Sequence, residues 1–176
     1  MIAITGLRSG TSLMMQTLKL LGFPIVGMKY HKHFSHKELN PRGYYDMPIE
    51  YTINGMNSYR HKGQAIKLYG AQLAKTDPKY VSKLIICERE YEPCIKSVQR
   101  LMELDVDITG LDPSPEHARL LHGVNIDLIE RSAKHIENIR VKFEDMLSDP
   151  DSTIKKVCKF LNIETAIDKA VENVVR

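Results

Sequence analysis

The stretch Ile4-Thr5-Gly6-Leu7-Arg8-Ser9-Gly10-Thr11-Ser12-Leu13-Met14-Met15 decides the fold class of this chain. It follows a short apolar run at the N-terminus, and it is typical of a strand that enters a glycine-containing turn and leaves as a helix. Such a turn directs backbone N–H groups inward, and the helix N-terminus adds partial positive charge. Arg8, Thr11 and Ser12 add side-chain donors. The segment therefore predicts a site for an anionic nucleotide.

This loop differs from the phosphate-binding loop of nucleotide triphosphatases. That loop has four residues between its glycines and continues as Gly-Lys-Ser/Thr. Here three residues separate Gly6 from Gly10, Thr11 stands in the lysine position, and the cation is Arg8. No acidic pair follows a second strand, so no metal site is predicted. A plain strand–turn–helix junction capped by Ser9 or Thr11 is the alternative, but a cation, a glycine and two hydroxyls within one turn favour an anion site.

Length and composition indicate one soluble globular domain. The chain has 176 residues, of which 43% are hydrophobic and 27% charged, with a net charge of +3. Lys and Arg are dispersed, so a nucleic-acid partner is not expected. No apolar stretch is long enough to span a membrane, and the N-terminus begins directly with a strand, which excludes a signal peptide. Cys87, Cys94 and Cys158 form no Cys-x-x-Cys pair, which favours reduced thiols and a cytoplasmic location.

Short apolar strands alternate with amphipathic helices along the chain. We expect strands near residues 2–5, 25–26, 65–69, 84–87 and 139–143, and helices near 12–21, from 93 onward, 114–134 and after 150. Residues 105–114 are typical of a Gly/Pro/Asp loop. The alternation predicts a three-layer α/β fold with a central, mostly parallel sheet flanked by helices. Ligands bind such sheets at the carboxyl ends of the strands, where the 6–12 loop, Lys67-Leu68-Tyr69 and Glu88-Arg89 should meet.

Three segments resemble the sulfotransferases that use 3′-phosphoadenosine 5′-phosphosulfate (PAPS). The first is Arg8-Ser9-Gly10-Thr11-Ser12, which is similar to the family's loop around the 5′-phosphosulfate. The second is the strand at 84–87 followed by Arg89 and Ser97. The third is 141–146 with Asp149-Pro150 and Phe160-Leu161, similar to the last core strand and the helix behind it. A further stretch, Asn40-Pro41-Arg42-Gly43-Tyr44-Tyr45-Asp46, resembles one in bacterial and phage-type members.

The resemblance implies a P-loop-like sulfotransferase fold over residues 1–176. It implies transfer of a sulfuryl group from PAPS to an acceptor hydroxyl or amine, with adenosine 3′,5′-bisphosphate (PAP) as product and no metal required. The residues that it implies for cofactor binding are Arg8, Ser9, Gly10, Thr11, Ser12, Arg89, Ser97 and Phe143, the last lining the adenine pocket. The chemistry agrees, because an Arg at a strand end and a Ser in the next helix can converge on one phosphate.

Each of these residues also has a purely structural interpretation. Arg89 could form a surface ion pair with Glu88 or Glu92, and Ser97 could be a solvated helix residue. Phe143 could belong to the core at a strand end.

Sulfuryl transfer depends on positioned cations, for which Arg8 and Lys67 are the candidates. Lys67 resembles the strand-end lysine of the cytosolic branch, and the alternative is an edge-strand lysine facing water. That branch has a His two residues further on, where this chain has Tyr69, a poor base near neutral pH. Other branches of the family use a carboxylate from an earlier segment, so the resemblance implies Asp46, which closes the 40–46 stretch, as the general base. The rival candidates are Glu38, Glu50, His31, His33 and His36.

The three loop histidines also fit a metal site, but no acidic or cysteine ligand is placed to complete it. A small-molecule or carbohydrate acceptor is expected, bound by the long segments 27–64 and 105–123. The family's C-terminal loop rich in Gly, Lys and Arg has no counterpart here, which leaves the cofactor affinity open. Two other functions also remain: a small P-loop kinase or other phosphotransferase, which the missing Gly-Lys-Ser/Thr disfavours, and a non-catalytic module that binds an adenosine bisphosphate.

Overall fold

A parallel β-sheet forms the centre of the molecule. The computed structural model describes residues 1–27, 29, 40–46, 58–110, 112–163, 168 and 170–172, with only the backbone of 105–109. The described strands are β1 (Ile2–Thr5), β2 (Ile25–Val26), β3 (Ala65–Leu68), β4 (Lys83–Glu88) and β5 (Asn138–Lys142). They pair in parallel in the order β2-β3-β1-β4-β5. The predicted α/β fold with a parallel sheet is confirmed.

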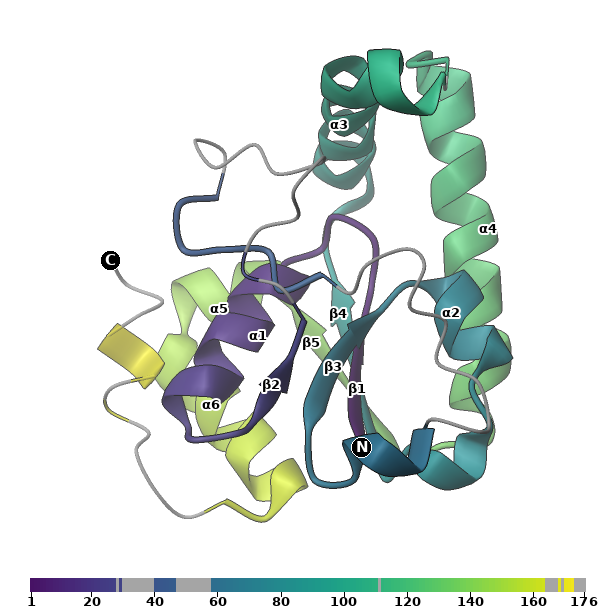
Figure 1. Cartoon of the computed structure of the whole chain (residues 1–176). Helices are drawn as coiled ribbons and strands as arrows, with labels where there is room; N and C mark the ends of the chain where they lie inside the picture. Colours follow the sequence, from purple (N-terminus) through teal and green to yellow (C-terminus); the bar gives the residue numbers. More distant parts are fainter. Residues whose placement is uncertain are drawn as a thin grey trace.

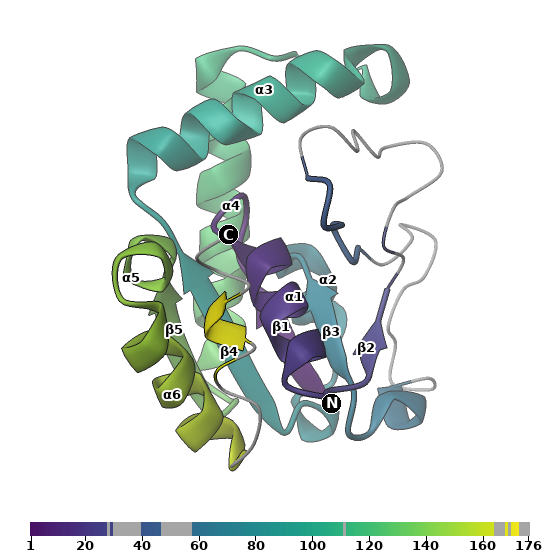
Figure 2. The ribbon, with the colours of Figure 1, turned by 90° about the vertical axis from the view of Figure 1, so that its left-hand side faces the viewer.

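Helices cover both faces of this sheet (Figure 1). They are α1 (Thr11–Leu20), α2 (Gly70–Lys75), α3 (Tyr91–Thr109), α4 (Pro115–Ala133), α5 (Phe143–Ser148) and α6 (Pro150–Leu161). Two short 3-10 turns, η1 (Ser58–His61) and η2 (Pro78–Tyr80), complete the described elements. Helices α1, α5 and α6 lie on one side and α2 and α4 on the other, while α3 crosses beyond the carboxyl ends of the strands (Figure 2).

The alternation of side chains along β1 produces the two core layers. Successive residues of a strand point to opposite faces. Ile2 and Ile4 belong to a buried cluster shared with Met14, Leu18, Ile154 and Val157 of α1 and α6. Ala3 belongs to the opposite cluster with Leu73, Ile129 and Ala133 of α2 and α4. Because both faces of β1 are fully packed, the loop that follows Thr5 starts from a rigid point.

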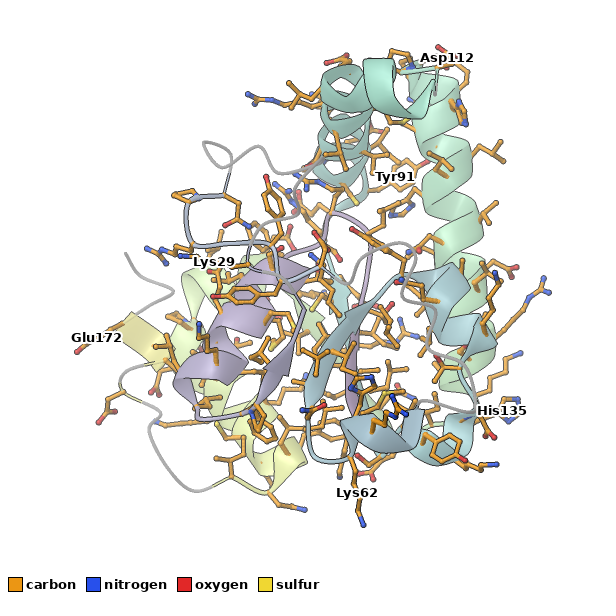
Figure 3. The ribbon with its side chains drawn as sticks, in the orientation of Figure 1. Lys29, Lys62, Tyr91, Asp112, His135 and Glu172 are labelled. Atoms are coloured by element: carbon orange, nitrogen blue, oxygen red, sulfur yellow. The ribbon has the colours of Figure 1, made fainter. Side chains whose placement is uncertain are left out.

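A third cluster joins α3 to α4 beyond the sheet. It contains Ile95, Val98, Met102 and Ala118, with Leu7 and Leu121 packed against it. At the start of α3, the Tyr91 ring meets the His122 ring edge-on at 5.4 Å between centroids. Figure 3 shows Tyr91 between the two helices and Asp112 at their far tip. The α3–α4 pair therefore stands over the edge of the sheet where the predicted site lies.

Two parts of the predicted secondary structure are wrong. Residues 105–109 continue α3 instead of forming a loop, because Asp105-Val106-Asp107-Ile108-Thr109 contains no helix breaker and the first one is Gly110, at φ 63°. With the start of α4 at Pro115, most of the segment 105–123 is helical. Phe143 begins α5 rather than ending β5. In addition, α2 was not predicted, although Ala71-Gln72-Leu73-Ala74-Lys75 consists of strong helix formers.

The chain does not offer a helix that could cross a lipid bilayer, as far as the described residues show.

The contact between α2 and α4 depends on Gly70. A Cβ at Gly70 would lie 2.5 Å from the carbonyl oxygen of Asn125, whereas a Cβ at Gly123, inside α4, would meet nothing within 4 Å. We expect Gly70→Ala to lower the free energy of unfolding by about 1–3 kcal/mol, since α2 and α4 must separate. Gly123→Ala should raise it by about 0.5–1 kcal/mol through helix propensity. Urea unfolding of both variants checks this, and equal effects would contradict the close packing.

Candidate functional site

The φ angle alternates in sign along the loop between β1 and α1. Gly6, Arg8 and Gly10 have φ angles of 137°, 55° and 87°. For Arg8 this conformation costs roughly 1–2 kcal/mol, and such strain is concentrated at functional sites. Successive residues of opposite hand turn their N–H groups into one concavity, which binds anions. The loop therefore has the backbone geometry that the sequence predicts.

Both glycines of this loop are also required by close contacts. A Cβ at Gly6 would overlap Ser9 Oγ and lie 2.5 Å from the carbonyl oxygen of Cys87. A Cβ at Gly10 would lie 2.6 Å from Cδ2 of Phe143. The loop is thus pressed against the end of β4 on one side and against the start of α5 on the other.

The alternative of a plain capped junction is wrong. The residue that precedes α1 is Gly10, no side chain caps the helix, and its first turn contains no acidic residue. Ser9 Oγ is buried and has no hydrogen-bond partner among the described residues, and it lies beside Gly6 rather than at the helix start. Ser9 Oγ therefore does not cap α1. Among the described residues, no side chain caps the N-terminal N–H groups of α1, and such groups suit an anion.

Arg89 lies directly after β4 and forms no ion pair with a carboxylate of the described residues. Its guanidinium carbon lies 4.7 Å from the centroid of the Phe143 ring. Its Nε is buried and has no hydrogen-bond partner among the described residues. The ion pair with Glu88 does not form, because Glu88 pairs with Arg140 at 2.6 Å. A guanidinium that stacks on an aromatic ring and has no carboxylate partner among the described residues suits a phosphate.

Arg8 connects the loop to α3. Its Nε donates a hydrogen bond to Oγ of Ser97, with 2.9 Å between the two atoms. The Sγ of Cys94, on the same helix, donates to the carbonyl oxygen of Leu7 at 2.8 Å, and burial raises the pKa of this thiol to about 11. Ser97 is therefore no solvated helix residue. The structure brings Arg8 and Ser97 together, and Arg89 precedes the same helix.

Lys67 is buried rather than facing water, so the edge-strand interpretation is wrong. Its Nζ lies 2.6 Å from Oδ1 of Asp46, and only 5% of its side chain is exposed. The same ammonium donates to the carbonyl oxygen of Tyr44 at 2.9 Å and to Oγ of Ser12 at 3.1 Å. Burial lowers the pKa of Lys67, and the Asp46 carboxylate opposes that shift. Lys67 thus links β3, α1 and the 40–46 segment.

Of the candidate bases, Asp46 is the one that lies among the described residues, and it is next to Tyr69. The Tyr69 hydroxyl donates to Oδ1 of Asp46 at 3.2 Å. The 40–46 segment is fastened to α1 by Gln16, whose Nε2 donates to the carbonyl oxygen of Gly43 at 2.9 Å. The rivals Glu38, Glu50, His31, His33 and His36 lie outside the described residues. Within the described part of the chain, no group of three His, Cys, Asp or Glu residues could hold a metal ion.

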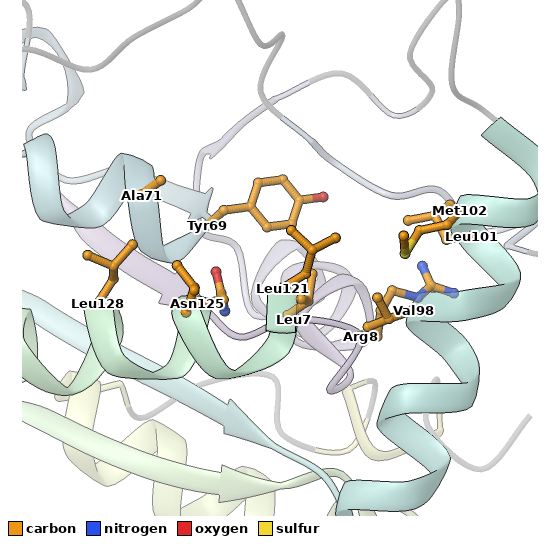
Figure 4. Close-up of a pocket in the computed structure, with 11 residues that line it drawn as sticks. Leu7, Arg8, Tyr69, Ala71, Val98, Leu101, Met102, Leu121, Asn125 and Leu128 are labelled. Carbon is orange, nitrogen blue, oxygen red and sulfur yellow. The ribbon is translucent and has the colours of Figure 1, made fainter. Parts of the chain in front are cut away.

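An apolar cavity of about 310 Å³ opens beside Arg8 and Tyr69 (Figure 4). One stripe of α4 lines it, namely Leu121, Val124, Asn125 and Leu128. The facing stripe of α3 is Val98, Leu101 and Met102, and Leu7 and Ala71 complete the wall. Sequence reasoning found the apolar face of α3 but not the cavity. The sequence shows the helical spacing of the apolar residues in the two stripes. The same spacing is typical of two helices that pack closely together, so it does not indicate a cavity.

Comparisons with known proteins support the fold. No family model matches the sequence, and no curated protein is similar to it. Eleven chains of solved structures are similar. One is a retinol dehydratase in complex with androsterone and the inactive cofactor PAP, with a TM-score of 0.51 and 12% identity over 98% of this chain and 63% of that chain. The chain thus spans less than two thirds of the retinol dehydratase. At this identity the likeness shows the fold, and it bears out the predicted α/β class.

The contact between Gly10 and Phe143 can be tested with a matched glycine. Gly22 has a φ of 86°, close to the 87° of Gly10, but a Cβ there would meet nothing within 4 Å. Both Gly→Ala changes should cost roughly 1–2 kcal/mol for the left-handed backbone. Gly10→Ala must also displace the Phe143 ring, so we expect its free energy of unfolding to fall by at least about 1 kcal/mol more. Urea unfolding measures both, and equal losses would contradict the packed loop.

Proposed function

We propose that this chain is a sulfotransferase that moves a sulfuryl group from PAPS to a hydroxyl or amine of a small-molecule acceptor. The observation that carries the proposal is Arg89, whose buried Nε lacks a hydrogen-bond partner among the described residues. It lies at the end of a strand beside the phosphate-type loop. The fold it shares with a PAP-bound retinol dehydratase supports the same class of donor.

The donor would be held at three points. The inward N–H groups of the 6–12 loop and the uncapped N-terminus of α1 suit the 5′-phosphosulfate. Arg89, which directly follows β4, and Ser97, on α3, suit the 3′-phosphate. The ring of Phe143 positions Arg89 by its cation–π contact, and a further contact with adenine stays a prediction. Thr11 is buried, so it would act through its backbone.

In PAPS the sulfuryl group is bound to the 5′-phosphate. This phosphate is the leaving group, and its negative charge increases as the bond to sulfur breaks. Arg8 would stabilise that charge, and its position in the loop and in the lining of the cavity supports this role. Lys67 already contacts three oxygen atoms, and we infer that it acts by fixing Ser12 and Asp46. Lys67 is then a positioning residue.

Tyr69 stands where the cytosolic branch has its histidine, and we infer that it relays the acceptor's proton. Of the Tyr69–Asp46 pair, Tyr69 lines the cavity, and its hydroxyl donates to Asp46. The acceptor oxygen would form its bond to sulfur as the bond from sulfur to the phosphate oxygen breaks. The acceptor's proton would pass to the Tyr69 oxygen while the Tyr69 proton passes to Asp46. Asp46 is thus the final base, reached through Tyr69.

Donor binding is the first test of this function. In titration calorimetry without metal, we expect PAP to bind the wild-type chain. Arg89→Ala and Ser97→Ala should each weaken PAP binding. The loss for Arg89→Ala should be at least about tenfold, because hydrogen bonds to charged groups are among the strongest. Arg131→Ala is the matched control, since Arg131 pairs with Asp127 on exposed α4. An absence of PAP binding by the wild-type chain would sink the proposal, and ATP with magnesium would then be tested.

The proton path predicts a separate kinetic effect. With labelled PAPS and 2-naphthol as acceptor, Tyr69→Phe and Asp46→Asn should each lower kcat by about 10²-fold or more while PAP affinity stays within about twofold. Tyr91→Phe is the control, because Tyr91 lies on α3 with its ring against His122. Full turnover by Tyr69→Phe would remove Tyr69 from the path, and full turnover by Asp46→Asn would remove the base.

A further inference from the structure

One side of α1 carries polar side chains that hold the segment of residues 40–46. They are Ser12, Gln16 and Lys19. Their spacing of four and three residues places them on the same side of the helix. They contact, in this order, the carbonyl oxygen of Tyr44, the carbonyl oxygen of Gly43 and the ring of Tyr45. The segment is therefore docked along about two turns of the helix whose N-terminus follows the phosphate-type loop.

Gln16 is the buried member of this stripe. Its side chain belongs to a residue that is only 8% exposed, and side-chain amides are buried at a high cost unless hydrogen bonds satisfy them. Its Nε2 donates to the carbonyl oxygen of Gly43 at 2.9 Å and to Oδ1 of Asn40 at 3.3 Å, so each N–H of the amide has an acceptor. Nδ2 of Asn40 donates to the same carbonyl oxygen at 3.0 Å. The two amides therefore fix the segment in one register on the helix.

The residue that precedes Asp46 has a strained backbone. Tyr45 has a φ of 57°, a left-handed conformation that is unfavourable for a residue with a Cβ. Such a conformation persists where the surrounding contacts enforce it. On one side of Tyr45, the carbonyl oxygen of Tyr44 accepts hydrogen bonds from Lys67 and Ser12, and on the other side Lys67 pairs with the Asp46 carboxylate. The position of that carboxylate therefore depends on how the preceding residues dock on α1.

We propose that Gln16 is a positioning residue for sulfuryl transfer, because it docks the 40–46 segment on α1 and so places the Asp46 carboxylate against the Tyr69 hydroxyl. This rests on the proposed sulfotransferase function, in which Asp46 receives the acceptor's proton through Tyr69. The hydrogen bonds of Gln16 go to the segment, and Gln16 does not line the cavity. Gln16 therefore acts through Asp46, and its loss should misplace the base without removing a contact to the donor.

The docking itself is tested without any ligand, by hydrogen exchange of backbone amides. The N–H groups of Gly43 and Tyr44 donate to the carbonyl oxygens of Asn40 and Lys29, so their exchange reports whether the segment is held. Gln16→Met keeps the length of the side chain and removes its donor. We expect both amides to exchange at least about fivefold faster in this variant, as the loss of a buried hydrogen bond implies. Unchanged exchange would overturn the proposal.

Two further variants separate docking from a disturbed helix. Thr17→Val is the matched control on α1, because Thr17 is buried and its hydroxyl donates to the carbonyl oxygen of Leu13 within the helix. It should change neither the exchange of the segment nor turnover. Asn40→Ala removes a partner of Gln16 from the segment and leaves α1 unaltered, and it should accelerate the same exchange. Acceleration by Thr17→Val to the same extent as by Gln16→Met would overturn the proposal.

Turnover distinguishes positioning from general stability. With labelled PAPS and 2-naphthol, Gln16→Met should lower kcat at least about tenfold while PAP affinity stays within about twofold. In a chain that already carries Asp46→Asn, the same change should lower kcat by less than about twofold, because Gln16 acts through Asp46. A merely structural role would lower kcat by the same factor in both backgrounds, and that result would overturn the proposal.

Failure of this inference and failure of the proposed function give different results. If the wild-type chain binds PAP and transfers the sulfuryl group but Gln16→Met keeps full kcat, the positioning role is wrong and the transferase stands. If the wild-type chain binds no PAP, the transferase is wrong and the positioning role falls with it. Amide exchange then still decides whether Gln16 docks the segment on α1.

Discussion

Parallel pairing on both sides of β1 is the constraint on which the site depends. Thr5 lies in register with Leu68 of β3 and with Ile86 of β4. The three strands therefore end at one edge, and the residues at these ends meet there although they are far apart in the sequence. The phosphate-type loop follows β1, Lys67 and Tyr69 lie at the end of β3, and Arg89 follows β4. The proposed donor site draws on all three of these segments.

The charges at this edge are unbalanced in the described part of the molecule. Asp46 pairs with Lys67, while Arg8 bonds a hydroxyl and Arg89 contacts an aromatic ring. Burial of Lys67 without Asp46 would leave a charge in an apolar environment, which is strongly disfavoured. Two guanidinium groups without carboxylates are suited to a ligand that brings several negative charges. The 40–46 segment thus contributes the carboxylate that stabilises Lys67, and the ligand would contribute the rest.

The sequence predicted those parts of the fold and site that depend on local patterns or on strand ends. The apolar runs located all five described strands, and the Gly6–Ser12 stretch located the loop. Arg89 and Ser97 were predicted from the resemblance to sulfotransferases, and their positions after a buried strand and in the next helix agree with that prediction. Helix α2 was missed because its first N–H is bound by Asn125, which is 55 residues away. The link from Tyr69 to Asp46 joins residues of different segments, which no spacing rule connects.

The cavity was missed for a related reason. The stripes on α3 and α4 have the spacing of ordinary core faces, and only the positions of both helices over the edge of the sheet reveal the space between them. The positive φ of Arg8 was also not predicted, because the sequence analysis attributed the turn of the loop to its glycines. Residue type and spacing therefore located the charged groups, while the acceptor side depends on helix placement.

The most direct test of the central claim is a crystal structure of the chain with bound PAP. The account predicts the 3′-phosphate within hydrogen-bond distance of Arg89 and Ser97, and the 5′-phosphate in the loop of residues 6–12 at the start of α1. A nucleotide bound elsewhere, or a complex in which Arg89 does not contact the nucleotide, would contradict it.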